Sequence, residues 1–407
     1  MSYVYTDEIK FANTTNFDAF GRLRVSEPFT LFDSSHRFAD NGLWSTGAAT
    51  GGTATFNSAQ GLVDLGVTAA SGSEVVRETT KVFTYQPGKS LLVLNTFVMS
   101  PAKTNLRQRV GYYGAANGYY LELNDSTVSF IERSFVTGAV VNTPVAQASW
   151  NVDPMNGSGP SGIMLDLTKA QILFMDLEWL GVGTVRIGFI IDGNYYVCHK
   201  FNHANIIATT YITTASLPLR YEITNTGATS GASTLKQICS SILSEGGYEL
   251  RGLQQAVGTP INSPRALTTA ATLYPIVSLR LKSARLDGIA IATAVSIIGN
   301  TAANYNWQLV SSGVTTGGTW ISAGLNSSVE YNLTGTAFAG GRIIASGYFT
   351  ATANTSVSID ILKAALFSNQ LERDGLTGTP YEFTIAIAAG TNGESAFASM
   401  DWEEISR

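Results

Sequence analysis

Short segments in which apolar and polar residues alternate, separated by turn residues, run through most of the 407-residue chain. Residues 119–133 form two such segments around the polar turn 124–126, and residues 184–201 form two more around Asp192-Gly193. A period of two is typical of half-buried strands, and Asp-Gly is a strong hairpin signal. Many short strands at regular spacing predict an all-β chain built from two-layer antiparallel sandwiches.

Charge is scarce, since 14% of the residues are charged, against roughly 25% in an average soluble protein. The 40 glycines and the many Ser and Thr residues favour turns, which excludes a coiled coil or a helix bundle. Because 30 acidic residues outnumber 25 basic ones, nucleic acid is not expected as a partner. No apolar run approaches the ~20 residues of a membrane helix, and residues 1–30 lack a secretory pattern, so neither membrane insertion nor a secretory signal is expected.

Changes in composition divide the chain into four parts. The first is rich in Phe and has no clean period, the second and fourth consist of predicted strands, and the third is a polar stretch with two prolines. We expect a docking arm at 1–42, a β-sandwich at 43–250, a linker at 251–265 and a smaller β-sandwich at 266–407. Residues 398–405 are predicted to be the final strand.

The arm carries aromatic side chains that it cannot bury alone, because a short segment has no second layer to cover them. We expect four phenylalanines to bury against a partner subunit, each contributing on the order of 1.5–3 kcal/mol, with two arginines in polar contacts at the rim. A disordered tail is the alternative, although such tails are poor in Phe. The expected docking residues are Phe17, Phe20, Arg22, Arg24, Phe29 and Phe32.

Asp176 and Glu178 form the strongest local cluster of residues that could carry chemistry. On a strand they would project to one face about 7 Å apart, and paired carboxylates serve as acid and base in glycosidases. The alternative is a solvated outer face, with Arg186 on the neighbouring strand balancing the charge. Because Asp-x-Glu departs from the Glu-x-Asp-x-x-Glu strand motif of concanavalin-like glycosidases, no catalytic residue is assigned.

The sequence gives no metal or cofactor signal. Cys198 and Cys239 belong to no Cys-x-x-Cys pair, which favours two buried free thiols and leaves a disulfide between them as the alternative. His199 and His203 are four residues apart, but the alternation around them indicates a strand leading into a loop instead of a metal-binding helix. We expect no cofactor and no metal site.

A cluster of tyrosines near two glycines offers a surface for carbohydrate. Tyr112, Tyr113 and Asn117 are the candidate glycan contacts, because tyrosine rings present a large area at low cost in side-chain entropy. The alternative is that some of the tyrosines fill the sandwich core. Tyr119 and Tyr120 must then point to opposite faces of their strand.

Several strings of the sequence, as a set, resemble a group of tailed-bacteriophage virion structural proteins. The resemblance covers roughly residues 10–250, with a weaker likeness at 340–347. The strings are Phe17-Asp-Ala-Phe-Gly-Arg-Leu-Arg-Val-Ser-Glu-Pro-Phe-Thr-Leu-Phe-Asp33, Tyr85-Gln-Pro-Gly-Lys-Ser90, Asp153-Pro-Met-Asn-Gly-Ser-Gly-Pro-Ser-Gly162, Glu178-Trp-Leu-Gly-Val-Gly183, Val185-Arg-Ile-Gly-Phe189 and Leu217-Pro-Leu-Arg-Tyr-Glu-Ile223.

This resemblance implies a non-enzymatic component of the virion whose middle domain is a concanavalin-like, lectin-like jelly roll. The expected partners are other virion proteins, further copies of the chain and a host-surface glycan. A tail or fibre position is favoured, and fibre-like parts are commonly trimers, although the residues do not count subunits. The alternatives are a capsid decoration or head fibre protein and, from another class, a virion-borne polysaccharide-cleaving enzyme.

Overall fold

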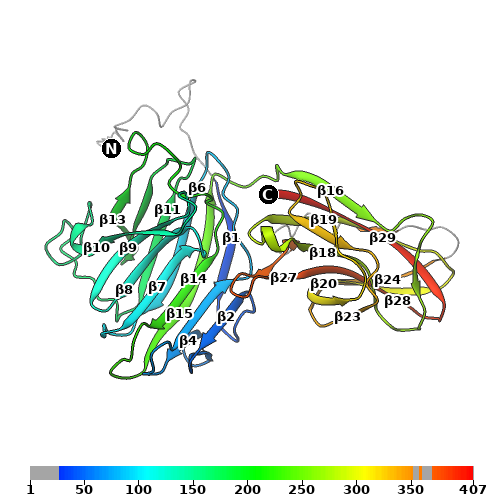
Figure 1. Ribbon diagram of the computed structural model, residues 1–407, viewed down its shortest axis with the longest axis horizontal. Coiled ribbons are helices and arrows are strands. Elements are labelled where there is room, and N and C mark those ends of the chain that lie inside the picture. Colours follow the sequence, from blue (N-terminus) through cyan, green and yellow to red (C-terminus); the bar gives the residue numbers. More distant parts are fainter. Residues whose placement is uncertain (1–26, 352–356, 360–368, 407) are drawn as a thin grey trace, which may run out of the picture.

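The computed structural model describes residues 27–351, 357–359 and 369–406. They form two β-sandwiches that lie side by side, and the chain passes from the first to the second after β15 (Ser233–Glu245) (Figure 1). The helical turns Gln147–Ser149 and Ser283–Arg285 are single 3₁₀ turns. The predicted all-β architecture of two sandwiches is confirmed. No helix in the described part of the chain has the length and apolar character needed to cross a membrane.

The first sandwich packs an eight-stranded antiparallel sheet against a seven-stranded one. The larger sheet contains β1 (Pro28–Ser35), β3 (Thr53–Asn57), β4 (Leu62–Val67), β6 (Ser90–Val98), β11 (Gln171–Leu177), β12 (Val185–Ile191), β13 (Asn194–Phe201) and β15. The smaller sheet contains β2 (Trp44–Ala49), β5 (Glu74–Thr79), β7 (Leu106–Tyr113), β8 (Gly118–Asn124), β9 (Thr127–Ser134), β10 (Val141–Ala146) and β14 (Leu219–Asn225).

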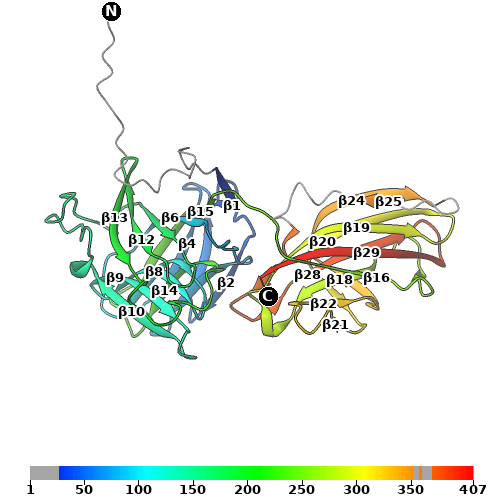
Figure 2. The same ribbon diagram turned by 90° about the horizontal axis from the view of Figure 1, so that it is seen from above.

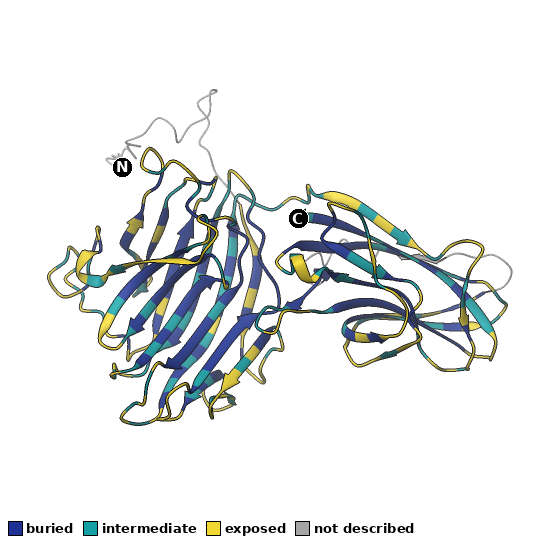
Figure 3. Ribbon diagram, in the orientation of Figure 1, coloured by how far each residue is buried: buried dark blue, intermediate teal, exposed yellow. Residues whose placement is uncertain are grey.

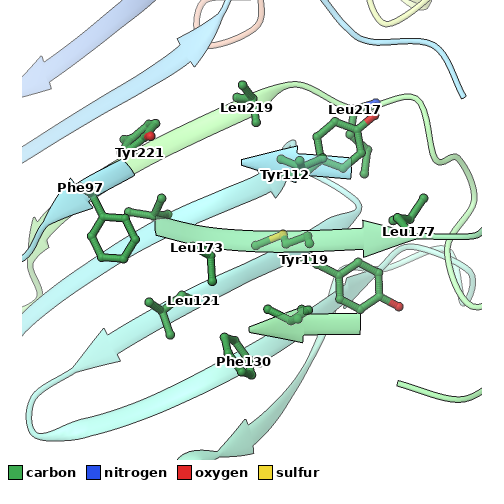
Figure 4. Packing of buried hydrophobic residues seen from close by; sticks show 14 of the residues in the cluster. Phe97, Tyr112, Tyr119, Leu121, Phe130, Leu173, Leu177, Leu217, Leu219 and Tyr221 are labelled. Carbon is green, nitrogen blue, oxygen red and sulfur yellow. Dashed lines mark hydrogen bonds between the residues drawn. The ribbon is translucent and has the colours of Figure 1, made fainter. Parts of the chain in front are cut away.

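The chain crosses repeatedly between these two sheets. The larger has the order β13-β12-β11-β6-β15-β4-β3, with β1 also on β15, and the smaller has the order β10-β9-β8-β7-β14-β5-β2. Thus β15 lies between β4 and β6, while β14 lies between β5 and β7 in the facing sheet. This alternation is the double-sheet arrangement of a jelly roll. The sheets enclose one core, part of which is seen in Figure 4, and exposed positions gather in the loops (Figure 3).

The hairpin turns lie where their sequence predicts them. Asp125 (φ 53°) joins β8 to β9, and Asp192 (φ 51°) with Gly193 (φ 78°) joins β12 to β13. These left-handed conformations are adopted readily by Gly and more easily by Asp than by most residues, which is why such residues occupy them.

The second sandwich packs a five-stranded sheet against a seven-stranded one. Figure 2 shows it from above, beside the first sandwich. The five-stranded sheet contains β16 (Leu253–Gly258), β17 (Arg265–Leu267), β19 (Ile289–Gly299), β25 (Val357–Ile359) and β29 (Glu394–Ser406). The seven-stranded sheet contains β18 (Tyr274–Leu281), β20 (Asn304–Thr316), β21 (Ile321–Ser322), β22 (Val329–Asn332), β23 (Ala337–Ala339), β24 (Arg342–Thr350) and β28 (Glu382–Ala389). The predicted final strand is confirmed as β29, which pairs with β16, β17 and β19.

The end of the expected docking arm belongs to the first sandwich. Residues 28–35 form β1, which pairs with β15, and Phe32 is 7% exposed with its ring against Trp44 and Phe83. Phe29 stacks on Tyr248 of the same chain, with ring centroids 5.8 Å apart. The prediction that Phe32 buries against a partner subunit is therefore wrong, because pairing with β15 makes the segment part of the larger sheet, and Trp44 of the facing sheet covers the Phe32 ring. Phe17, Phe20, Arg22 and Arg24 lie outside the described residues.

The expected linker is also structured in part. Residues 253–258 form β16, which pairs with Leu253 opposite Glu404 and Gly258 opposite Ser399 on β29. The side chains of β16 are exposed or half-buried along its whole length. A strand of this kind is held by backbone hydrogen bonds at a sheet edge, so it leaves no hydrophobic alternation in the sequence.

The junction between the sandwiches is buried and ionic. Val82, which follows β5, packs with Ile289 and Ile291 of β19 in a small apolar cluster. Arg373 is 2% exposed and donates to the carbonyl oxygen of Thr79 (2.8 Å), while its guanidinium lies 2.9 Å from a Glu78 carboxylate oxygen. The two sandwiches are thus fastened together by buried polar contacts in addition to the connecting chain.

Candidate functional site

A polar cleft of about 380 Å³ opens where three neighbouring strands of the larger sheet begin or end. β6 and β12 begin at this end of the sheet and β11 finishes there, because adjacent strands are antiparallel. The residues that line the cleft, here called the Asp176 cleft, are Gly88, Lys89, Ser90, Asp176, Glu178, Thr184 and Arg186.

Asp176 is the anchored carboxylate of this cleft. It lies directly opposite Arg186 in the β11–β12 pair, and the two side chains form an ion pair. Ser90 Oγ lies 3.1 Å from Asp176 Oδ1 and 3.2 Å from Glu245 Oε2. A hydroxyl donates one hydrogen, so Ser90 can serve only one of these two carboxylates at a time. Either Asp176 Oδ1 or Glu245 Oε2 is therefore left able to accept a hydrogen bond from a ligand hydroxyl or from water.

Glu178 and Thr184 are placed by the loop that connects β11 to β12, here called the 178–184 loop. The Glu178 N–H donates to the Thr184 carbonyl (3.2 Å), and the Gly183 N–H donates to the Trp179 carbonyl (2.7 Å). A Cβ at Gly183 would overlap the Glu178 carbonyl, so only glycine fits this close approach of the backbone. Asp176, Glu178 and Arg186 line the same cleft, and the expected charge balance of Asp176 by Arg186 is confirmed by their ion pair. The prediction that both carboxylates lie on one strand is wrong for Glu178, because β11 ends at Leu177.

A second cleft of about 380 Å³ shares Lys89 with the first and extends to the junction. Its other lining residues are Tyr85, Gln86, Pro87, Glu249, Arg251 and Ile405. The Lys89 ammonium donates to Gln86 Oε1 (2.9 Å) and to the Gly247 carbonyl (3.2 Å), which holds the side chain between the two clefts.

The chemistry of the Asp176 cleft suits hydrogen bonding to a polyhydroxylated ligand. Carboxylates accept from sugar hydroxyls, while Lys89, Arg186 and the Thr184 hydroxyl donate, so both senses of hydrogen bond are available. An arginine-paired Asp176 lacks the apolar surroundings that keep a catalytic acid protonated in glycosidases. Among the described residues, no group of three or more His, Cys, Asp or Glu side chains is arranged to hold a metal ion.

The predicted glycan contacts are not at the surface. Tyr112 and Tyr113 are fully buried and Asn117 is 4% exposed, so the prediction that they form a sugar platform is wrong. Tyr112 fills the core, where its hydroxyl bonds the carbonyl oxygen of Ala215 at 2.8 Å and accepts from the Leu217 N–H at 3.0 Å (Figure 4). Asn117 joins two loops, since its Oδ1 accepts from the N–H groups of Phe135 and Thr213.

Tyr113 is covered on the outer face of the smaller sheet by side chains from other strands. Its ring lies 4.4 Å from that of Tyr120, and the guanidinium carbons of Arg133 and Arg220 lie 5.4 and 5.5 Å from the centre of its ring. The prediction that Tyr119 and Tyr120 point to opposite faces is confirmed, because Tyr119 belongs to the core and Tyr120 to this outer cluster.

The cysteines are both free, which agrees with the favoured prediction. Cys198 is buried with its sulfur 3.2 Å from that of Met155, and burial raises the pKa of its thiol to about 12. Cys239 is exposed on β15, so the expectation that both thiols are buried is wrong for this residue. A register shift between Gln237 and Cys239 interrupts the alternation of β15, so that Cys239 lies on the outer face and Ser240 is buried.

Lys89, Ser90 and Thr184 are the cleft residues that sequence reasoning missed as members of one site. β6 and β11 are neighbours only in space, because about 80 residues of chain separate Ser90 from Gln171. Lys89-Ser90 and Glu178–Gly183 both occur in the strings that resemble virion proteins. That resemblance did not indicate that the two segments lie close together in the fold.

No protein-family model matches the chain, and no curated protein matches it by sequence. Solved structures that resemble it include the Emp47p carbohydrate recognition domain, with 11% identity, a TM-score of 0.34, and coverage of 54% of this chain and 97% of that one. Peanut lectin has 11% identity and a TM-score of 0.31, covering 54% and 98%. A Bacteroides ovatus mixed-linkage glucan GH16 protein has 12% identity and a TM-score of 0.35, covering 52% and 99%.

Proposed function

We propose that this chain is a non-enzymatic structural component of a tailed-phage virion and that its first sandwich contacts a surface glycan through the Asp176 cleft. The single observation that carries the glycan contact is the cleft itself, in which carboxylates, Lys89 and Arg186 converge within about 380 Å³. The virion assignment rests on the sequence strings that resemble virion proteins, three of which contribute residues to this cleft.

In this proposal, a tail or fibre position presents the sandwiches to the host surface, and the segment that precedes β1 attaches the chain to the particle. Because residues 28–35 are part of the first sandwich, a truncation that tests attachment has to begin at Glu27 and keep β1. Loss of this chain from particles after removal of residues 1–26 supports the arm as anchor, and normal incorporation contradicts it.

The glycan contact is tested with the purified full chain on an array of immobilised bacterial surface polysaccharides. Asp176→Asn and Glu178→Gln should each weaken binding roughly tenfold to a hundredfold, since a hydrogen bond to a charged group contributes about 1.5–3 kcal/mol. Asp192→Asn is the matched control, because it removes an exposed carboxylate from the far end of β12 at a positive φ that Asn tolerates.

Two outcomes contradict the glycan contact: absence of binding by the wild-type chain, and equal binding by wild type, Asp176→Asn and Glu178→Gln. Shortening of the bound polysaccharide during incubation would support the enzymatic alternative instead. A capsid decoration protein is distinguished by its copy number, which quantitative mass spectrometry of purified particles measures.

A further inference from the structure

His203 is a buried histidine whose two ring nitrogens both face hydrogen-bond acceptors. Its Nδ1 lies 2.6 Å from the carbonyl oxygen of Gly183, and its Nε2 lies 2.8 Å from Glu132 Oε2. The side chain is 6% exposed and its ring stacks on Tyr211, with centroids 3.9 Å apart. A carbonyl and a carboxylate can only accept, so the histidine has to donate from both nitrogens to satisfy the two contacts.

Counting hydrogens shows that this arrangement holds one proton more than a neutral imidazole beside an ionised carboxylate. The Tyr119 hydroxyl already donates to Glu132 Oε2 at 2.5 Å, and the Nδ1 hydrogen is committed to Gly183. The 2.8 Å contact between His203 Nε2 and Glu132 Oε2 needs a further hydrogen, which is bonded either to the imidazole or to the carboxylate. When that proton leaves, a neutral imidazole can donate to Gly183 or to Glu132, but not to both.

The contact to Gly183 matters because it lies in the 178–184 loop beside the Asp176 cleft. The segment that follows β13 forms several hydrogen bonds with this loop. The Tyr211 hydroxyl donates to the Glu178 carbonyl (3.0 Å), and the Tyr211 N–H donates to the Gly181 carbonyl (3.0 Å). The indole N–H of Trp179 in turn donates to the Ile212 carbonyl (3.3 Å). These contacts and the one from His203 to Gly183 are here called the clasp, and the His203 contact is the one that depends on the extra proton.

The two tyrosines that contact the ring stay uncharged. Burial raises the pKa of Tyr211 and, with the nearby Glu132 carboxylate, that of Tyr119 well above the ordinary value for tyrosine. Glu132 from β9, Tyr119 from β8 and Tyr211 from the same segment are the ionisable groups in contact with His203. The extra proton is therefore shared between His203 and Glu132.

We propose that His203, in its doubly protonated form, is a positioning residue that holds the 178–184 loop, and with it Glu178 and Thr184, in the geometry of the Asp176 cleft. The effect on ligand binding rests on the function proposed for that cleft, whereas the effect on the loop does not. Since the folded state holds the proton, the loop is secured at lower pH and loosens as the pH rises and the proton leaves.

The protonation state is measured directly by NMR of the full chain labelled with ¹⁵N in its three histidines. Burial, together with Arg77, lowers the pKa of His36 to about 4, and burial lowers that of His199. At pH 6 the signals of a histidine with both ring nitrogens protonated should be present in wild type and in His199→Gln, and they should vanish in His203→Gln. A neutral His203 at pH 6 overturns the proposal.

The response of the loop is measured by the fluorescence of Trp179, taken as the difference between the wild-type chain and Trp179→Phe, from pH 5.5 to 9. We expect a transition in wild type and in His199→Gln, a control that removes a histidine outside the clasp. His203→Gln should abolish it. Glu132→Gln should also abolish it and keep the low-pH signal throughout, because an amide NH₂ can donate to a neutral His203 and to the Tyr119 oxygen without an extra proton. A transition that persists in either variant overturns the proposal.

The effect of the loop on ligand binding is measured with the polysaccharide of the array that the wild-type chain binds most tightly. Wild-type affinity should fall at least threefold from pH 6 to pH 8.5, and affinity in Glu132→Gln should not change. If no polysaccharide binds while Trp179 still titrates through His203, the function proposed for the cleft fails and the positioning role stands. If binding occurs with no pH dependence in wild type, the positioning role fails.

Discussion

Replacement of Arg373 by alanine is expected to weaken the junction between the sandwiches severely. Arg373 lies 2.9 Å from Glu78 and 3.0 Å from Asp287, and donates to the Thr79 carbonyl. Without Arg373, the Glu78 carboxylate keeps Arg220 as a charged partner at 3.4 Å. The Glu78 side chain is 3% exposed, so water does not replace the lost partner. Removing one partner of a buried ion pair costs about 3–5 kcal/mol, because the other charge is left uncompensated.

The pH dependence of the stability lost in Arg373→Ala gives a sharper test than the size of that loss at one pH. Burial raises the pKa of Glu78, while Arg373 and Arg220 act to lower it. A carboxyl with a raised pKa in the folded state takes up its proton more readily when folded, so the folded protein loses stability as the pH rises through that value. Loss of Arg373 raises this pKa further. The cost of Arg373→Ala should therefore be larger at pH 7 than at pH 5.

The assay is urea unfolding of the full chain at both pH values, followed by circular dichroism. Arg251→Ala is the control, since its ion pair with Glu249 is largely exposed and should contribute about 0–1 kcal/mol. In the double variant Arg373→Ala/Glu78→Gln the loss should shrink, because the unpaired charge is gone. A cost of Arg373→Ala below about 1 kcal/mol, or one that is the same at pH 5 and pH 7, would refute this account of the junction.

Three further predictions concern the first sandwich. Tyr112→Phe should cost about 1–3 kcal/mol in chemical unfolding, because it leaves the buried Leu217 N–H unpaired, whereas Tyr195→Phe at a 54% exposed position should change little. In the native protein iodoacetamide should alkylate Cys239 and spare Cys198, which becomes reactive only after unfolding, as intact-mass spectrometry would show; modification of both in the folded state would contradict the burial of Cys198. Gly188→Ala should prevent pairing of β12 with β13, because the added Cβ would overlap the Tyr196 carbonyl, and a variant with wild-type stability would contradict that register.

Local patterns in the sequence were sufficient to predict most of the strands and the hairpins that join them. The turns at Asp125 and Asp192 and the alternation of Tyr119 and Tyr120 depend only on neighbouring residues, and the structure has them as predicted. β16 was missed because an exposed edge strand is held by backbone bonds that leave no trace in side-chain polarity.

Features that depend on distant pairing could not be predicted. The burial of Phe32 follows from the pairing of β1 with β15, about 200 residues away, and Tyr113 is covered by Arg133 and Arg220 from separate strands. In the candidate site, the partnership of Asp176 with Arg186 was predictable because a short hairpin joins them. The contribution of Ser90 was not, since β6 reaches β11 only in the folded sheet.

The claim that the Asp176 cleft is the glycan-contact surface is tested most directly by hydrogen–deuterium exchange of the full chain with and without its tightest array polysaccharide. The account predicts that binding slows exchange in residues 86–90 and 176–186, which contribute the cleft from β6, β11 and β12. Exchange in the second sandwich, at β16 and β29, should not change. Protection confined to the second sandwich, or to the outer face of the smaller sheet around Tyr120, would contradict the claim.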